Sequence, residues 1–166
     1  LQSFFNLMKP RVMYLVLFTC MVGLLIAPTS IEFSSSLISL LAVAIGSGAA
    51  GALNMWYESD LDALMSRTCL RPIPTGKIKK NQALYFGIVL SAISIMMLSY
   101  SANLISAILL ASTIGFYFFI YTIWLKRKTP QNIVIGGASG ALPPVIGWTI
   151  ATNSLTFEAI TFFLII

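Results

Sequence analysis

The sequence predicts an all-α fold, a polytopic transmembrane helical bundle, and its composition carries that prediction. Hydrophobic residues make up 58% of the 166 residues and charged residues only 9%, against about 25% charged residues in a soluble domain. A transmembrane helix needs about 20 predominantly apolar residues, so the chain has room for five complete spans and part of a sixth. The ten Lys and Arg residues are confined to three segments between the apolar runs. These features exclude a soluble globular protein.

Each expected span is an apolar run between polar breaks. The runs cover residues 12–27, 37–57, 83–100, 104–125 and 132–151, and a sixth begins near residue 157. Because the last run is too short to cross a bilayer, we expect residues 1–166 to form a single membrane domain that is the N-terminal portion of a longer protein. In the fifth span, Pro143 and Pro144 are expected to break the helix, since proline removes a backbone hydrogen bond.

The positive charges predict the orientation of the chain in the membrane. They precede the first span and follow the second and fourth spans, whereas the loops after the first, third and fifth spans carry none. Cytoplasmic loops of membrane proteins carry the excess of Lys and Arg, so we expect the N-terminus and the basic loops on the cytoplasmic or matrix side. Membrane topology also explains the net charge of +5, and no nucleic-acid partner is expected.

A stripe of oxygen-bearing side chains ends the second span. Asn54, Glu58 and Asp62 recur every four residues, and on a helix that continues from Leu37 to Asp62 they share one face, with Asp60 pointing elsewhere. The chain has no histidine, and its two cysteines have no metal-ligand spacing. Carboxylates and an amide without His or Cys suit Mg²⁺. The alternative is an acidic helix end at the membrane interface that binds no metal.

Basic residues follow the stripe in a loop constrained by proline. Arg67 and Arg71 are four residues apart, and Lys77 lies beyond two prolines. Guanidinium groups make bidentate contacts with phosphate oxygens, and lysine adds a point charge. Carboxylates for Mg²⁺ beside such cations are typical of a diphosphate site, whereas Lys79 and Lys80 are better explained by topology and lipid headgroups.

Two segments resemble a known family. GALNMWYESDLDALMSRTCLRPIPTGKI resembles the first acidic motif of the UbiA-type intramembrane prenyltransferases. The second segment, YTIWLKRKTPQNIVIGGASGALPPVIGW, resembles the branch of that family that farnesylates protoheme IX. The resemblance extends over essentially the whole chain, although chains of the family are much longer. It implies a helical bundle around a central cavity, in which Mg²⁺ joins farnesyl diphosphate to two acidic motifs.

The resemblance also implies roles for individual residues. Asn54, Glu58 and Asp62 would be the catalytic motif and the ligands of Mg²⁺, with Glu58 where the family usually has Asp. The diphosphate would be bound by a set of basic and polar side chains, namely Arg67, Arg71, Lys77, Lys126, Arg127 and Gln131. After Asp62 the only acidic residue is Glu158. The family's second acidic motif is therefore absent from this chain, which supplies one wall of the site.

The implied reaction transfers farnesyl from farnesyl diphosphate to a vinyl group of protoheme IX, in a bacterial inner (plasma) membrane or the mitochondrial inner membrane. Breaking the allylic C–O bond leaves charge on the diphosphate and a carbocation, so the site must supply cations and exclude water. Besides the lipid bilayer and these substrates, a complementary C-terminal half is a further expected partner. The alternatives are a quinone-precursor acceptor, a noncatalytic or split-enzyme fragment, and a cation transporter. A transporter requires acidic residues near mid-membrane on several helices, and only one helix end has them.

Overall fold

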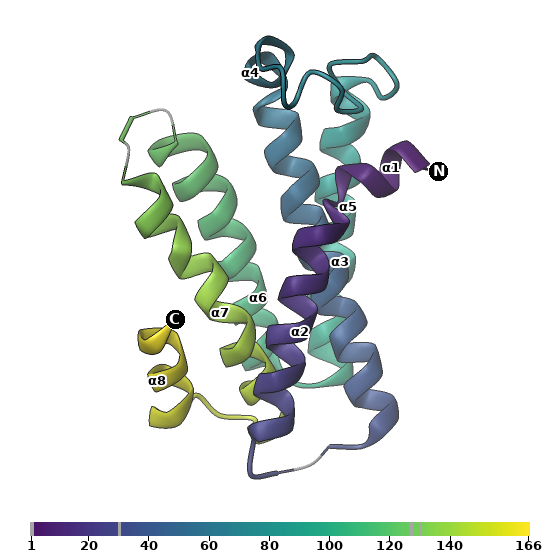
Figure 1. Ribbon diagram of the computed structural model, residues 1–166. Coiled ribbons are helices and arrows are strands. Elements are labelled where there is room, and N and C mark those ends of the chain that lie inside the picture. Colours follow the sequence, from purple (N-terminus) through teal and green to yellow (C-terminus); the bar gives the residue numbers. More distant parts are fainter. Residues whose placement is uncertain (1, 30, 127, 130) are drawn as a thin grey trace.

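The computed structural model describes residues 2–29, 31–126, 128–129 and 131–166, and most of these residues are helical (Figure 1). In chain order the helices are α1 (Gln2–Leu7), α2 (Pro10–Ile26), α3 (Phe33–Tyr57), α4 (Ser59–Leu64), α5 (Lys80–Ser101), α6 (Leu104–Gly115), the π-helix η1 (Phe116–Leu125), α7 (Asn132–Thr152) and α8 (Phe157–Ile165). The predicted all-α helical bundle is confirmed.

Four helical segments of the described chain are long and apolar enough to cross a membrane. They are α3, α5, the continuous run of α6 and η1 over Leu104–Leu125, and α7. The expected first span corresponds to α2, which is apolar but has only 17 residues. The expected sixth run forms the nine-residue helix α8. The order of apolar helices therefore agrees with the order of apolar runs in the sequence.

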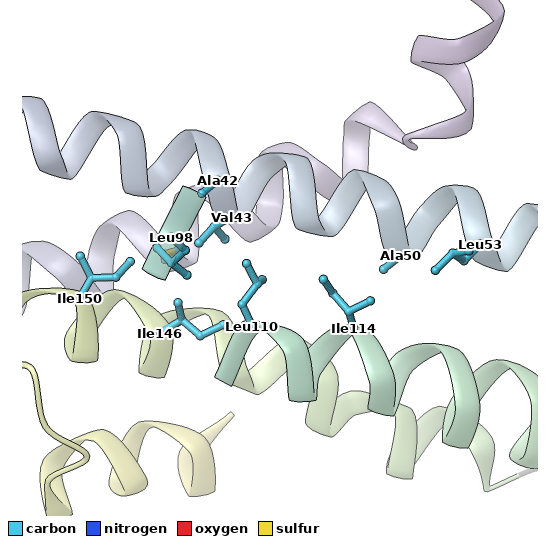
Figure 2. Packing of buried hydrophobic residues seen from close by; sticks show 10 residues of the cluster. Ala42, Val43, Ala50, Leu53, Leu98, Leu110, Ile114, Ile146 and Ile150 are labelled. Carbon is cyan, nitrogen blue, oxygen red and sulfur yellow. The ribbon is translucent and has the colours of Figure 1, made fainter. Parts of the chain in front are cut away.

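The helices bury small and aliphatic side chains between them. The most extensive contacts join α3 to α5 and α2 to α7. Between these pairs, Val43 and Ala50 on α3 face aliphatic side chains of α6 and α7, including Leu110 and Ile146 (Figure 2). Small residues on α3 allow neighbouring backbones to approach closely, which is how membrane helices gain packing contacts.

The second expected span, 37–57, ends where α3 ends, and a helix that continues unbroken to Asp62 is not formed. Helix α3 ends at Tyr57, and Glu58, with φ −88° and ψ 4°, joins it to the short helix α4. Backbone hydrogen bonds still run from the Glu58 N–H to the Asn54 carbonyl at 3.0 Å and from the Asp62 N–H to the Glu58 carbonyl at 2.8 Å. Because the four-residue register persists across the junction, the stripe remains aligned, and Asp60 is exposed as expected.

The expectation that Pro143 and Pro144 break the fifth span is wrong, because α7 continues through both residues. Helix α2 crosses α7 at this point with almost no space between the backbones. A Cβ atom built on Gly147 would lie 2.0 Å from the Cys20 carbonyl oxygen, and one on Gly23 would lie 2.1 Å from the Pro144 carbonyl oxygen. Proline is tolerated in membrane helices where a neighbouring helix supports the segment, and this crossing provides that support.

The basic segments lie at one end of the bundle. The α1–α2 junction, helix α4 with the loop to α5, and the end of η1 with the start of α7 are at the same end of the bundle (Figure 1). The end of α2 with the start of α3, the α5–α6 connection and the α7–α8 connection are at the other end. The alternation of charged and uncharged loops in the sequence has therefore become a separation in space. The candidate site forms at the charged end.

Candidate active site

The α1–α2 junction is seated on the glycine-rich face of α3. A Cβ atom on Gly48 would lie 2.5 Å from Met8 Cε, and one on Gly51 would lie 3.2 Å from the Met8 carbonyl oxygen. The next residue, Lys9, has a left-handed backbone with φ 52° and precedes α2. A non-glycine residue in this conformation is uncommon and is held there by its surroundings. The glycines thus let Lys9 approach the end of α3.

Asn54, the first residue of the stripe, is fully buried. Its side-chain oxygen accepts a hydrogen bond from the Lys9 ammonium, and its amide nitrogen donates to Thr122 Oγ1 at 3.1 Å. Burial and, to a smaller extent, the positive charge of Arg71 lower the pKa of Lys9 to about 8. Asn54 therefore connects a cation from the N-terminal segment to the π-helix.

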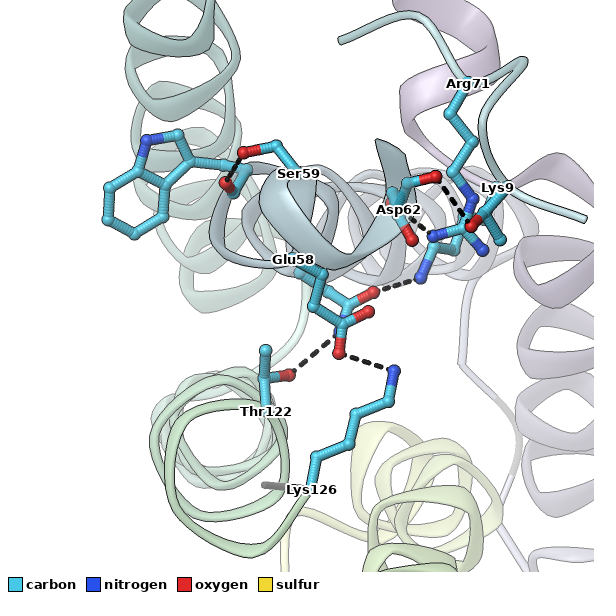
Figure 3. A network of polar contacts seen from close by, with 10 residues as sticks. Lys9, Glu58, Ser59, Asp62, Arg71, Thr122 and Lys126 are labelled. Atoms are coloured by element: carbon cyan, nitrogen blue, oxygen red, sulfur yellow. Dashed lines mark hydrogen bonds and ion pairs between the residues drawn. The ribbon is translucent and has the colours of Figure 1, made fainter. Parts of the chain in front are cut away.

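Glu58, the second residue, forms an ion pair with Lys126 at the end of η1. Lys126 Nζ lies 2.5 Å from Glu58 Oε1, and the carboxylate is 5% exposed (Figure 3). Although the ion pair is short, Glu58 Oε1 accepts no hydrogen bond of regular geometry from the described residues. A buried carboxylate oxygen without a hydrogen bond is costly unless a charge stabilises it, and here the ammonium does so.

Asp62, the third residue, is held by the loop that follows α4. Arg71 Nη1 donates to Asp62 Oδ2 at 2.7 Å, and the Asp62 side chain is 5% exposed. Thr68 Oγ1 donates to the Asp62 backbone carbonyl at 3.1 Å. Each stripe residue is thus paired with a cation from a different segment of the chain, as Figure 3 shows for Lys126 and Arg71.

The cluster has an excess of positive charge. Within the described residues, the three cations Lys9, Arg71 and Lys126 face the two carboxylates of Glu58 and Asp62. A pocket of about 100 Å³ opens beside both carboxylates, and its lining also includes the exposed Arg67. A net positive balance of charges around such a pocket favours an anion there.

An apolar cavity of about 120 Å³ begins where the polar cluster ends. Its walls come from α2, α3, α6, η1 and α7, and they include Ala50, Ile114, Tyr117 and Ile146. Lys9 lines this cavity and also contacts Asn54. The site therefore has a charged compartment and an apolar compartment that meet at Lys9.

The structure brings together most, but not all, of the residues that the sequence singles out. Glu58 pairs with Lys126 and Asp62 with Arg71, and these four residues line one pocket together with Arg67. The Asn54 side chain contacts Lys9 and Thr122 instead. Lys77 is exposed in the loop after α4 and Gln131 is exposed before α7, and neither lines the described part of that pocket. Arg127 lies outside the described residues.

Two residues of the cluster were missed by sequence reasoning. Lys9 was ascribed to membrane topology, and Thr122 was not singled out. The only signal for Lys9 was its place directly before Pro10, which starts a helix well. Nothing in the spacing of Thr122 relates it to Asn54, 68 residues earlier.

The donor set fits Mg²⁺. Among the described residues no group of three or more His, Cys, Asp or Glu side chains converges, so a metal would be held by two carboxylates and one amide oxygen. Mg²⁺ is commonly bound by one or two carboxylates, with water and substrate phosphates completing its coordination.

The sequence profile of the UbiA prenyltransferase family matches residues 16–166. The chain belongs to this family. The chain is also similar to the protoheme IX farnesyltransferase of Pelagibacter ubique (strain HTCC1062). The two sequences are 73% identical over 165 residues, which cover 99% of this chain and 54% of that protein. The protoheme IX farnesyltransferase of Ehrlichia canis (strain Jake) is 58% identical over 164 residues, covering 99% of this chain and 56% of that protein. The chain spans about half the length of these relatives.

The UbiA fold is recognisable in solved structures. A UbiA homologue from Archaeoglobus fulgidus bound to DMAPP and Mg²⁺ superimposes with a TM-score of 0.77 at 18% identity, covering 97% of this chain and 59% of that one. The same homologue bound to GPP and Mg²⁺ gives the same TM-score. UbiA membership and the apolar helices identify an integral, multi-pass membrane protein.

Proposed function

We propose that this chain supplies one wall of a Mg²⁺-dependent prenyltransferase that transfers a farnesyl group from farnesyl diphosphate to protoheme IX, giving haem O. One observation carries the proposal. Three cations are each paired with one residue of the Asn54, Glu58 and Asp62 stripe, and one of them, Lys9, also lines the apolar cavity. A prenyl diphosphate has the matching shape, with an anionic head and an apolar tail.

The two compartments divide the work of the reaction. The apolar cavity binds the prenyl chain and excludes water, which protects an allylic carbocation. Arg67, Arg71 and Lys126 contact the diphosphate, while Asn54, Glu58 and Asp62 hold Mg²⁺. The metal supplies electrostatic stabilisation of the departing diphosphate. Lys77, Arg127 and Gln131 belong to the proposal through the family motif, as outer contacts to the diphosphate.

The acceptor is proposed from the relatives. Both relatives described above are protoheme IX farnesyltransferases, and they match this chain along almost its whole length. This supports protoheme IX over a quinone precursor. The remaining wall of the site, including a second acidic motif, would come from a C-terminal half, and residues 1–166 would be one part of a single membrane domain.

The charged end of the bundle is proposed to face the cytoplasm or the mitochondrial matrix, in the bacterial inner (plasma) membrane or the mitochondrial inner membrane. The supporting argument is the absence of Lys and Arg from the loops after the first, third and fifth spans. Cysteines placed at Thr75 and Leu155 test the orientation. A membrane-impermeant thiol reagent added to intact cells should label only the cysteine at Leu155.

The activity is tested in a chimera in which this chain replaces the matched portion of the Pelagibacter ubique relative. Membranes with the chimera are incubated with farnesyl diphosphate, Mg²⁺ and either protoheme IX or a hydroxybenzoate as a quinone precursor, and products are identified by mass spectrometry. We expect haem O, no prenylated hydroxybenzoate, and loss of product when Mg²⁺ is chelated. Formation of only the hydroxybenzoate product would contradict the proposed acceptor.

A matched pair of charge changes tests the site itself. Asp62→Asn removes a buried carboxylate from the stripe, whereas Asp60→Asn removes the same charge from an exposed position on the same short helix. We expect Asp62→Asn to reduce haem O formation at least about 100-fold, as losses of electrostatic stabilisation do, and Asp60→Asn to retain activity. Equal activity of the two variants would refute the proposed metal site.

A further inference from the structure

Thr122 links the π-helix to the stripe through a directed chain of hydrogen bonds. Its side chain is fully buried. Thr122 Oγ1 donates to the Tyr117 carbonyl at 2.8 Å and accepts from Asn54 Nδ2 at 3.1 Å. Figure 3 shows the Thr122 hydroxyl directed at the stripe from the neighbouring helix.

Hydrogen-bond chemistry permits only one orientation of the Asn54 amide in this chain. A hydroxyl has one proton, and Thr122 uses it on the Tyr117 carbonyl. Thr122 can therefore only accept from Asn54, so the amide nitrogen must face Thr122. At the other end, the Lys9 ammonium is only a donor, so the amide oxygen must face Lys9. Both neighbours independently require the same orientation.

The π-helical register allows the Thr122 hydroxyl to reach the Tyr117 carbonyl. In an α-helix a threonine hydroxyl bonds the carbonyl three or four residues earlier, whereas Thr122 bonds the carbonyl five residues earlier. The widened turns continue to Lys126, whose backbone N–H donates to the Tyr121 carbonyl at 3.0 Å, again five residues earlier. The π-helix η1 thus carries Thr122, which contacts Asn54, and is followed directly by Lys126, which contacts Glu58. Such segments are rare and frequently occur at functional sites.

We propose that Thr122 is a positioning residue that holds the side-chain oxygen of Asn54 toward the charged cluster. This inference rests on the proposed function, in which the Asn54 side-chain oxygen is a ligand of Mg²⁺. Without the hydroxyl, the amide nitrogen loses its acceptor and only the Lys9 contact still favours this orientation, so the amide oxygen is held less firmly. Thr122 therefore acts through Asn54 and touches no reacting atom.

The first test measures Mg²⁺-dependent binding of inorganic pyrophosphate to the chimera in nanodiscs. Thr122→Val keeps the side-chain shape and removes the hydroxyl, whereas Thr122→Ser keeps the hydroxyl. Loss of a group that orients a metal ligand weakens metal binding about 10- to 100-fold. We expect Thr122→Val to raise the apparent Kd for Mg²⁺ about tenfold and Thr122→Ser to remain close to the parent protein. Equal weakening by both variants would indicate loss of packing and overturn the proposal.

A double-mutant cycle separates positioning from general damage. Asn54→Ala alone should weaken Mg²⁺-dependent binding, and adding Thr122→Val should cause no further change, because the residue through which Thr122 acts is already gone. If Thr122→Val weakens binding by the same factor with and without Asn54, Thr122 does not act through Asn54 and the proposal is wrong.

A metal-free measurement keeps the proposal testable if the proposed function fails. The side-chain NH₂ signal of Asn54 can be assigned in ¹⁵N-asparagine-labelled protein by its loss in Asn54→Ala. We expect Thr122→Val, but not Thr122→Ser, to shift this signal without added Mg²⁺. An unchanged signal in Thr122→Val would overturn the positioning role. A shifted signal in a chimera that binds neither Mg²⁺ nor pyrophosphate would support the orientation and refute the proposed function.

Discussion

The α2–α7 crossing should not tolerate a methyl group at Gly147. In Gly147→Ala the new Cβ would lie 2.0 Å from the Cys20 carbonyl oxygen and 2.8 Å from the Leu24 backbone nitrogen. Ordinary contacts between carbon and a carbonyl oxygen are about 3.3 Å or longer. The two helices must therefore separate by about 1.3 Å at this point, since both obstructing atoms belong to the backbone and no side-chain rotation relieves them.

The expected loss of stability is about 3 kcal/mol. Overpacking a well-packed interior costs about 1–3 kcal/mol, and a backbone obstruction belongs at the upper end of that range. About 3 kcal/mol corresponds to a roughly 100-fold lower ratio of folded to unfolded protein. Because α2 and α7 both line the apolar cavity, their separation should also weaken binding of a prenyl diphosphate more than binding of inorganic pyrophosphate.

Gly137→Ala on the same helix is the matched control, because its Cβ would meet nothing within 4 Å. Replacing glycine by alanine in a helix normally stabilises it by about 0.5–1 kcal/mol, so the control should be at least as stable as the parent. The assay is reversible unfolding in mixed detergent micelles, followed by tryptophan fluorescence. If Gly147→Ala and Gly137→Ala unfold at the same denaturant concentration, the close crossing is wrong.

Three further predictions concern the charged and apolar compartments. Arg71→Ala should raise the KM of the chimera for farnesyl diphosphate or lower kcat by about tenfold or more, because it removes the proposed phosphate contact and leaves Asp62 buried without its partner. Lys79→Ala, at an exposed position, should change neither, and equal effects of the two variants would contradict the proposed role of Arg71. Glu58→Asp should retain most activity, since the long side chain of its partner can follow the shortened carboxylate, and a greater loss of haem O than in Asp62→Asn would refute this. Ala50→Leu should fill part of the 120 Å³ cavity and weaken binding of a C15 diphosphate more than of a C5 diphosphate in competition assays, and parallel weakening of both would argue against the cavity as the prenyl site.

Most of the fold was predictable from the sequence. Apolar runs long enough to cross a bilayer become helices because no water is available there to satisfy the backbone, so the order and approximate limits of the helices follow from hydropathy. The stripe was also predictable, because the interval of four between Asn54, Glu58 and Asp62 is a local helical property that survives the break at Glu58. The family resemblance followed from the same local motifs.

Departures from regular helix geometry were not predictable. Pro143 and Pro144 are strong helix breakers by local chemistry, yet α7 continues because α2 packs against it. The π-helical register of η1 likewise has no signal in its run of apolar and aromatic residues. At the two prolines, contacts from a neighbouring helix outweigh the local preference of the segment.

The amino-acid sequence by itself determines which segments are apolar enough to span a membrane and which loops are charged. It also determines which oxygen-bearing side chains share one face of a helix. Only the tertiary structure decides which cation pairs with each stripe residue. Lys9 and Asn54 are 45 residues apart, and Asn54 and Thr122 are 68 apart. Their contacts exist because glycines on α3 admit the α1–α2 junction and because the π-helix turns Thr122 toward the stripe. Such pairings depend on the distance and orientation between helices, and those depend on packing of the whole bundle rather than on residue spacing along the chain.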